Sequence, residues 1–583
     1  MRQKVLLSIC LGNFLFLAPA SFEARQPSSD PGAAGALTVT VAEYSFGDTA
    51  FNTPALPGPV EVTGRVFYPS SLAGGPYPVL LFLHGRHATC YIGDEHGGTA
   101  FLQWPCTSPT VPIPSYRGYD YVASVLASHG YIVVSIGANG VNARDNQVFD
   151  LGAQARADLI QHHLDLWNTF NTSGGAPFGS TFVGKVDLTR VGTMGHSRGG
   201  EGVVRHYLHN ASLGSPYGIK AVFPLAPVDF NRPVINNVPL SVLLPYCDGD
   251  VADLQGVHFF DDARYNAPGD TAPKHTVLVM GANHNFYNTM WTPDIFRPGS
   301  ADDWKTFVPG GASDPHCGEG SRSERLTPEQ QRGTLLAYMG AFFRTYVGGE
   351  SQFVPMLTGD APAPPSAQTN DLFVSYHAPD DPARRRDVNR LLTAANLSTN
   401  TLGGAVSQSG ITPYELCGGE APQPRHCLPG ERTSRQPHTS VSARSPATRG
   451  LSQLQAGWTS ITASFDNLVP VGSGDVTSFA AVQFRASVNF TDARNAAGAP
   501  QDLTVTLTDR TNQSATVRVS DVSGALFYPP GELIHVPKVF LNTIRVPLSA
   551  FSGIDLTDVA SVRLDFDRTT TGALLIADLA FAR

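Results

Sequence analysis

The stretch Gly195-His196-Ser197-Arg198-Gly199 has the residue pattern of a nucleophile elbow. An apolar run ending at Met194 precedes it, and a segment of helical character, Glu201 to Leu208, follows it. The flanking glycines let the chain turn sharply from a strand into a helix, so the serine hydroxyl is expected to project at the helix N-terminus. There the helix dipole and the free backbone N–H groups favour negative charge. A serine placed in this way can attack an acyl carbon.

A serine nucleophile needs a base within hydrogen-bond reach, and the base needs an acid that holds its tautomer. Candidates for both follow in the order Ser, Asp, His, each directly after an apolar run. The run from Leu240 to Leu244 leads to Asp248 and Asp250, and the run from His275 to Met280 leads to His284. We expect His284 to be the base and Asp250 the acid, with Asp248 as the alternative acid. The competing interpretation is that these are loop residues without a catalytic role.

Two backbone N–H groups are candidates for binding the negatively charged oxygen of such a reaction. One belongs to Arg198, which follows the serine, and the other to Arg86, in the turn His84-Gly85-Arg86 after the apolar run Val79–Leu83. The role requires only the backbone of these two arginines. A plain turn at the end of a strand is the alternative for Arg86.

Between Leu37 and Gly349, near-continuous apolar runs alternate with amphipathic helical segments, a pattern typical of a parallel sheet covered on both faces. The predicted buried strands are Val79–Leu83, Tyr131–Ile136, Val191–Met194, Ala221–Phe223, Ser241–Leu244 and Thr276–Met280. The looser alternation from Thr38 to Phe67 favours antiparallel edge strands. Residues 37–350 are therefore predicted to form a doubly wound, mostly parallel α/β domain, with the candidate site at the carboxyl ends of its strands.

A Pro-rich stretch within residues 351–370 predicts a linker, and the pattern then changes to short alternating strands separated by turns. Residues 371–583 are predicted to form an all-β sandwich. We expect Asp371–His377 to be its first strand and Thr412–Gly450 to be a long loop. At 583 residues the chain is long enough for two such domains.

Residues 1–20 predict an export signal, with Arg2 and Lys4 before an apolar stretch and Ala18-Pro19-Ala20 as the cleavage site. Residues 21–36 would then link it to the first domain. The apolar stretch is too short for a comfortable membrane span and no later segment qualifies, so we expect a secreted protein, extracellular or periplasmic, without a transmembrane segment.

Removal of the signal takes away Cys10 and leaves six of the seven cysteines. Disulfides persist in exported proteins. Sequence proximity suggests the pairs Cys90–Cys106 and Cys417–Cys427, which leaves Cys247 with Cys317, although six cysteines allow fifteen pairings. Free buried thiols are the alternative.

Composition excludes some partners. A net charge of −9 over the whole chain predicts no affinity for nucleic acid. We expect no metal site, because Asp94-Glu95-His96 lies in a Gly-rich loop and His162-His163 places adjacent side chains on different faces of a helix.

The segment Gly195-His196-Ser197-Arg198-Gly199-Gly200 resembles the lipase motif of chlorophyllases and of the dienelactone hydrolase and cutinase-like polyester-hydrolase branch of the α/β-hydrolase superfamily. Ala127–Tyr131, Pro224–Pro227 and Tyr246–Asp250 extend the resemblance, which spans Val79 to Tyr346. It implies the α/β-hydrolase fold and a secreted serine hydrolase that cleaves carboxylic esters through an acyl-enzyme. It further implies a triad of Ser197, Asp250 and His284, no cofactor, and a small-molecule or polymeric ester as substrate, for example a lipid or a polyester.

Two features depart from this family. The stretch from Arg86 to Tyr116 is unusually long, and a Cys90–Cys106 bridge would make it a rigid wall over the site. The closing run of the C-terminal domain, from Ile544–Leu548 through Ile576–Asp578, resembles a galactose-binding-like or carbohydrate-binding jelly roll, for which a structural role is the alternative to a carbohydrate ligand. Two other functions remain open: a secreted serine peptidase or amidase of the same fold, and a non-catalytic binding protein with a vestigial elbow.

Overall fold

The structure, a computed structural model, describes residues 30–419, 426–429, 433–439, 443–444 and 450–583. The predicted signal peptide, residues 1–20, and the start of the predicted linker 21–36 lie outside the described residues. Within the described residues, no helix combines the length and the apolar character that a membrane crossing needs.

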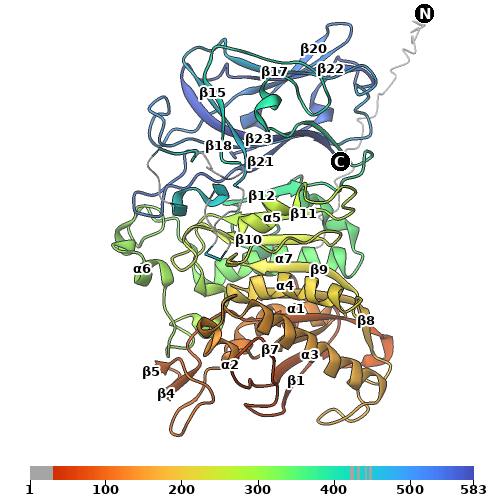
Figure 1. The fold of residues 1–583 in the computed structure, drawn as a ribbon, viewed down its shortest axis with the longest axis vertical. Helices are drawn as coiled ribbons and strands as arrows, with labels where there is room; N and C mark the ends of the chain where they lie inside the picture. Colours follow the sequence, from red (N-terminus) through yellow and green to blue (C-terminus); the bar gives the residue numbers. More distant parts are fainter. Residues whose placement is uncertain (1–29, 420–425, 430–432, 440–442, 445–449) are drawn as a thin grey trace, which may run out of the picture.

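A nine-stranded mixed sheet organises the N-terminal part of the chain, in the order β1-β2-β7-β3-β8-β9-β10-β11-β12 (Figure 1). The six strands from β7 to β11 in this order pair in parallel, whereas β1, β2 and β12 pair antiparallel. The nine strands are β1 (Val39–Ser45), β2 (Thr63–Pro69), β3 (Tyr77–Leu83), β7 (Ile132–Ile136), β8 (Val186–His196), β9 (Ile219–Leu225), β10 (Leu240–Pro245), β11 (Lys274–Val279) and β12 (Leu372–His377). The predicted mixed α/β core, mostly parallel, is confirmed.

Helices cover both faces of this sheet, and two consecutive residues of β3 illustrate this. Leu81 packs into a core that includes Trp167 of α3, whereas its neighbour Phe82 packs into a second core that includes Phe342 of α7. A strand buried on both sides must be apolar at every position, which explains the continuous apolar runs. The α-helices are α1 (Asp120–Ser128), α2 (Asn139–Asn142), α3 (Ala153–Thr172), α4 (Arg198–Ser212), α5 (Val257–Ala263), α6 (Asp303–Phe307), α7 (Pro328–Tyr346) and α8 (Val354–Thr358).

The long connection after β3 is not a plain loop. It contains a small antiparallel sheet in the order β5-β4-β6, formed by β4 (Cys90–Asp94), β5 (Gly97–Phe101) and β6 (Val111–Pro112). The Cys90–Cys106 disulfide ties β4 to the segment before β6.

Two antiparallel sheets form the C-terminal part. The first has the order β15-β16-β23-β18-β21, with β13 also paired to β23, and the second has the order β14-β17-β22-β19-β20. Phe484 and Ile576 of the first sheet share one core with Phe465 and Leu564 of the second. The strands are β13 (Arg385–Asn389), β14 (Val406–Ser409), β15 (Ile411–Cys417), β16 (Gln453–Trp458), β17 (Ser464–Leu468), β18 (Ala481–Val488), β19 (Thr504–Asp509), β20 (Ser514–Arg518), β21 (Asn542–Pro547), β22 (Val559–Asp565) and β23 (Gly572–Ala582).

Two details differ from the sequence-based expectation. The segment Asp371–His377 does not open the sandwich, because β12 pairs antiparallel with β11 and completes the edge of the nine-stranded sheet. The start of the expected long loop, Thr412–Gly450, is also wrong, since residues 411–417 pair with β16 as strand β15. In both cases long-range pairing decides the structure, and local sequence does not reveal the partner.

The two parts share an extensive interface. Val536 and Phe540 of the C-terminal part belong to the hydrophobic core that contains Tyr246, at the end of β10. The buried Asp261 carboxylate of α5 accepts a hydrogen bond from Arg485 of β18 at 2.8 Å. The C-terminal part therefore contributes to the packing of the N-terminal part.

Candidate active site

Ser197 sits between β8 and α4 with φ 57° and ψ −124°, a conformation that costs energy for any residue with a side chain. A Cβ on Gly195 would lie 2.0 Å from the carbonyl oxygen of Gly199, so the turn requires glycine there. The amide of Ser197 donates to the carbonyl of Leu225 at 2.9 Å, which ties the turn to β9. These features are those of a nucleophile elbow.

His284 lies in the loop after β11, and its Nδ1 is 2.8 Å from Oδ2 of Asp248. Both side chains are buried. The rings of His284 and His196 are 4.9 Å apart, and Nε2 of His196 lies 3.1 Å from the His284 carbonyl. The loop of His284 therefore packs directly against the residue that precedes Ser197.

The structure places Asp248, not the expected Asp250, on Nδ1 of His284. The Asp250 side chain is 50 % exposed, and its carboxylate lies 3.8 Å from Nε2, the other ring nitrogen. The local reason is an Asx turn directly after β10, in which Oδ1 of Asp248 accepts the backbone N–H groups of Asp250 at 2.9 Å and Val251 at 2.6 Å. This turn directs Asp248 inward and leaves Asp250 at the surface.

The charge of Asp248 determines the protonation of His284. Burial alone lowers the pKa of this histidine, but the adjacent Asp248 carboxylate reverses the effect and raises the pKa to about 9. Nε2 of His284 is buried and has no hydrogen-bond partner among the described residues. This nitrogen is therefore available to exchange a proton with a group that enters the site.

The turn that contains Gly85 and Arg86 lies against the elbow. A Cβ on Gly85 would be 2.5 Å from Cβ of Ser197, so only glycine allows this close approach. Arg198 is the first residue of α4, and its N–H therefore has no acceptor within the helix. The turn after β3 therefore lies directly beside the elbow from which α4 begins.

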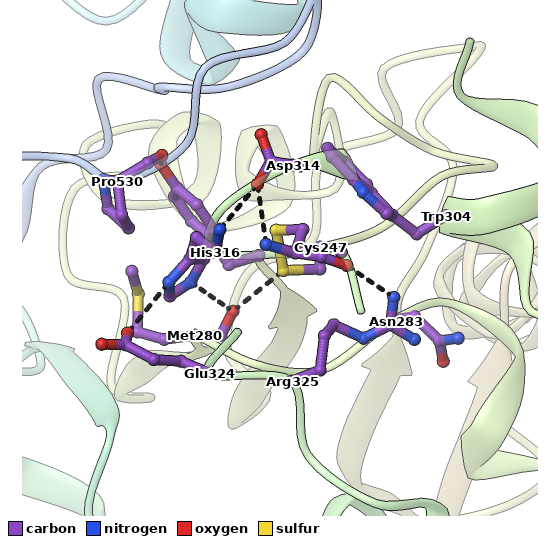
Figure 2. Close-up of a disulfide and its surroundings, with 12 residues drawn as sticks. Cys247, Met280, Asn283, Trp304, Asp314, His316, Glu324, Arg325 and Pro530 are labelled. Atoms are coloured by element: carbon purple, nitrogen blue, oxygen red, sulfur yellow. Dashed lines mark hydrogen bonds and ion pairs between the residues drawn. A yellow bond between two sulfur atoms is a disulfide. The ribbon is translucent and has the colours of Figure 1, made fainter. Parts of the chain in front are cut away.

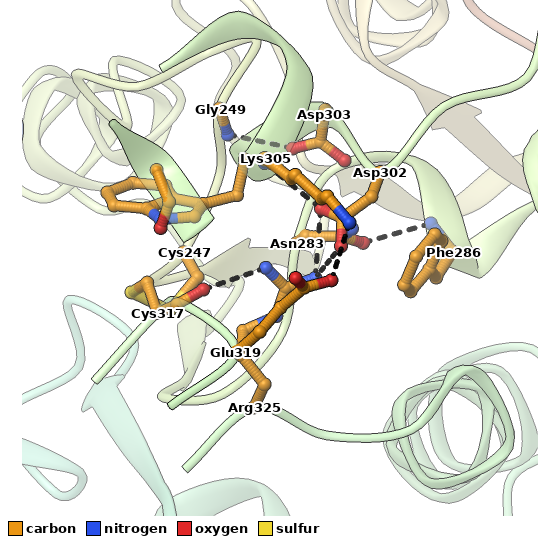
Figure 3. A network of polar contacts seen from close by, with 12 residues as sticks. Cys247, Gly249, Asn283, Phe286, Asp302, Asp303, Lys305, Cys317, Glu319 and Arg325 are labelled. Atoms are coloured by element: carbon orange, nitrogen blue, oxygen red, sulfur yellow. Dashed lines mark hydrogen bonds and ion pairs between the residues drawn. A yellow bond between two sulfur atoms is a disulfide. The ribbon is translucent and has the colours of Figure 1, made fainter. Parts of the chain in front are cut away.

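Asp303, which was not predicted from the sequence, joins the loop after β10 that carries Asp248 (the acid loop) to the loop after β11 that carries His284 (the histidine loop). Its Oδ2 accepts the N–H of Gly249 at 2.8 Å (Figure 3). The same oxygen accepts the N–H of His284 at 3.0 Å, and Oδ1 accepts that of Asn285 at 2.9 Å. Burial and the nearby charge of Asp248 raise the pKa of Asp303 to about 7. No local signal in the sequence distinguishes Asp303 from the neighbouring Asp302.

A disulfide also holds the acid loop, at the residue before Asp248 (Figure 2). Cys247, directly before Asp248, is bonded to Cys317. Asp314 accepts the N–H groups of His316 at 3.0 Å and of Cys317 at 2.7 Å, which shapes the turn that carries the second sulfur. The three predicted disulfides, Cys90–Cys106, Cys247–Cys317 and Cys417–Cys427, are all confirmed.

Cys247, His316 and Cys317 also lie close enough together to be considered as metal ligands. The two sulfur atoms are bonded to each other, however, and a thiolate is the form of cysteine that binds metal. Nδ1 of His316 lies 2.9 Å from the Glu324 carboxylate. The group therefore acts as a covalent and polar anchor in this structure.

Comparison with known protein families gives a match to part of the chain. The family model described as PETase, PET hydrolase-like, matches residues 113–295, roughly a third of the chain. No curated protein matches the chain. The matched region includes Ser197, Asp248 and His284, but neither Arg86 nor Asp303. Over residues 113–295, which carry the elbow, the acid loop and the histidine loop, the chain is similar to the PET hydrolase-like family.

Proposed function

We propose that this protein is a serine esterase with the α/β-hydrolase fold. The observation that carries the proposal is the buried His284 ring, with Nδ1 on the Asp248 carboxylate at 2.8 Å and its loop against the strained elbow of Ser197. The similarity of residues 113–295 to PET hydrolase-like proteins supports an ester as the substrate.

In the proposed reaction, Oγ of Ser197 attacks the ester carbonyl carbon while Nε2 of His284 takes the hydroxyl proton. Asp248 holds the ring and stabilises the imidazolium. The N–H groups of Arg86 and Arg198 bind the oxyanion. The tetrahedral intermediate collapses, the bond to the alcohol oxygen breaks, and His284 gives that oxygen its proton.

Water completes the cycle. His284 removes a proton from a water molecule, the hydroxide attacks the acyl-enzyme, and the carboxylic acid leaves as Oγ of Ser197 recovers its proton. Every bond change uses groups of this chain, the ester and water.

We further propose that the protein acts outside the cytoplasm, because disulfides form and persist in oxidising compartments and are rare in the cytosol. For the C-terminal sandwich, predicted to be a jelly roll, we favour a structural role over carbohydrate binding. The support is its contribution of Val536 and Phe540 to the core beside the acid loop.

The test is hydrolysis of p-nitrophenyl esters from acetate to palmitate by the native protein and by Ser197→Ala. We expect turnover by the native protein and a loss of at least about 10³-fold in the variant. The preferred chain length would define the size of the acyl pocket. Labelling by a fluorophosphonate without ester turnover would favour the peptidase or amidase, and the absence of both in a folded protein would favour the binding protein.

A further inference from the structure

One buried carboxylate contacts three arginines beside the elbow. Asp145, in a 3-10 turn at Asp145–Gln147, has no exposed side-chain surface. Its Oδ1 lies 3.1 Å from Nε of Arg86, and its Oδ2 lies 2.8 Å from Nη2 of Arg156 and 2.9 Å from Nη1 of Arg198. Two of these three partners, Arg86 and Arg198, are the residues whose N–H groups are proposed to bind the oxyanion.

The third partner anchors the cluster to the fold. Arg156 of α3 is fully buried, and its guanidinium also donates to Oδ1 of Asn142 at 2.8 Å and to the carbonyl of Leu151 at 3.0 Å. The amide nitrogen of Asn142 in turn donates to the carbonyl of Gly85 at 2.8 Å. The cluster therefore contacts the Arg86 turn at two points, the Arg86 side chain and the Gly85 carbonyl.

The contacts extend to the other side of the elbow. Arg198 also donates from Nη1 to Oδ1 of Asn146 at 2.9 Å, and its guanidinium lies over the Phe230 ring at 5.5 Å from the centroid. The side chains of Arg86 and Arg198 are only 29 % and 16 % exposed, so neither is a freely moving surface arginine. Three guanidinium groups against one carboxylate leave the cluster with an excess of positive charge.

We propose that Asp145 is a positioning residue for the oxyanion hole: by binding the guanidinium groups of Arg86 and Arg198 together, it fixes the two backbone N–H groups of these residues. The inference rests on the proposed function. Donors aligned before the reaction stabilise the oxyanion without reorganisation, and a small displacement weakens them. Asp145 touches neither substrate nor reacting atoms.

The test compares Asp145→Asn with the native protein in three measurements. These are kcat and KM on p-nitrophenyl butyrate, inhibition by an alkyl trifluoromethyl ketone that forms a tetrahedral oxyanion on Ser197, and inhibition by the product carboxylate. We expect kcat to fall about 10- to 100-fold, below the 10²- to 10³-fold loss typical for deletion of a whole donor. Binding of the ketone should weaken in parallel with kcat/KM, whereas KM and product inhibition should change little.

Asp261→Asn is the matched control, since Asp261 is also buried and faces Arg485 and His438, but in the interface with the sandwich. This variant should lower the melting temperature without weakening binding of the ketone relative to binding of the product carboxylate. Arg86→Met and Arg198→Met keep the backbone N–H groups and provide a second route if Asp145→Asn folds poorly. Each arginine variant should weaken binding of the ketone. Adding Asp145→Asn to the double arginine variant should weaken that binding little further, because the effects of substitutions at coupled residues are not additive.

A folded Asp145→Asn that keeps native kcat/KM and ketone affinity would overturn the inference, as would equal losses in Asp261→Asn. So would arginine variants that leave ketone binding unchanged. Failure of the proposed function would look different, because the native protein would then neither hydrolyse esters nor react with a fluorophosphonate.

Discussion

Two aspartates separated by one glycine face the same histidine in different ways, and the acid assignment depends on which ring nitrogen each reaches. Asp248 meets Nδ1 at 2.8 Å inside the protein, and Asp250 lies 3.8 Å from Nε2 at the surface. In the proposed reaction Nε2 exchanges a proton with the serine, so the group on Nδ1 is the one that can hold the tautomer.

We therefore expect Asp248→Asn to lower kcat by about 10³- to 10⁴-fold, because an amide on Nδ1 no longer stabilises the imidazolium. Asp250→Asn should change kcat by less than about threefold, since its carboxylate is half exposed and screened by water. Steady-state kinetics on p-nitrophenyl butyrate checks both. Equal losses in the two variants, or the larger loss in Asp250→Asn, would contradict the assignment.

The raised pKa of His284 predicts an alkaline pH profile. Because the base must be neutral to accept the serine proton, and its pKa is about 9, kcat/KM should rise with pH towards this value. The Asp248 carboxylate causes the rise, so Asp248→Asn should move the ascending limb to lower pH while its plateau falls. Rates measured between about pH 6 and pH 10 decide this. A profile that is already flat at neutral pH in the native protein would count against it.

Sequence order and motif predicted Ser197 and His284 as candidates, because an elbow and a loop after a strand are local features. The choice between Asp248 and Asp250 was not accessible in the same way, since it depends on an Asx turn that only side-chain geometry reveals. Asp145 and Asp303 were missed for a related reason. Each gains its role from backbone or side-chain groups far away in the chain, and neither stands in a motif.

At the level of elements, the site depends on connections between the loops that follow β10 and β11. Asp303, at the start of α6, accepts N–H groups from both loops. Cys247–Cys317 attaches the acid loop to the segment that follows α6. The sheet sets the direction of the loops, and these two anchors set their relative position.

We expect Asp303→Asn to lower the rate of fluorophosphonate labelling at least about tenfold and to destabilise the fold by about 1–3 kcal/mol, because an amide offers one acceptor oxygen where the carboxylate offers two. Fluorophosphonate labelling rates and thermal unfolding provide the two readouts. Glu319→Gln is the control, since this carboxylate pairs with the exposed Lys305. Native labelling rates in Asp303→Asn would show that the two loops keep their positions without it.

Several elements were predictable from pattern alone. Continuous apolar runs identified the parallel strands because those strands are buried on both faces. Strand β12 was assigned to the wrong sheet because the linker before it suggested a new domain, while its partner β11 lies about a hundred residues earlier in the chain. Proximity in the sequence predicted Cys90–Cys106 and Cys417–Cys427 and left Cys247 to pair with Cys317, and the structure confirmed all three pairs.

For the molecule as a whole, the two parts share buried groups and should unfold together. The Tyr246 hydroxyl donates to the carbonyl of Pro530 at 2.9 Å and accepts the N–H of Lys538 at 3.2 Å. Arg264 of the N-terminal part forms a buried ion pair with Asp578 of β23. An interface built from such contacts couples the stability of one part to that of the other.

We expect calorimetry of the native protein to show one cooperative transition instead of two. Tyr246→Phe should shift that single transition to lower temperature and lower the free energy of unfolding by about 1–3 kcal/mol. The reason is that it leaves a buried carbonyl and a buried N–H without their partner. Tyr414→Phe, which removes a hydroxyl bonded to the Leu397 carbonyl inside the sandwich, is the matched control. It should shift the same single transition. Two resolved transitions, each sensitive to only one of the variants, would show that the parts unfold independently.

The position of β12 and of residues 530–540 also has a consequence for the timing of synthesis. A nascent chain that has reached residue 350 already contains Ser197, Asp248 and His284, yet its sheet lacks the edge strand that covers β11. Tyr246 still lacks Pro530 and Lys538, and the surrounding core still lacks Val536 and Phe540. An unfinished chain therefore carries the reactive groups without the packing that aligns them. On the proposed function, ester hydrolysis begins only after the C-terminal end has been made.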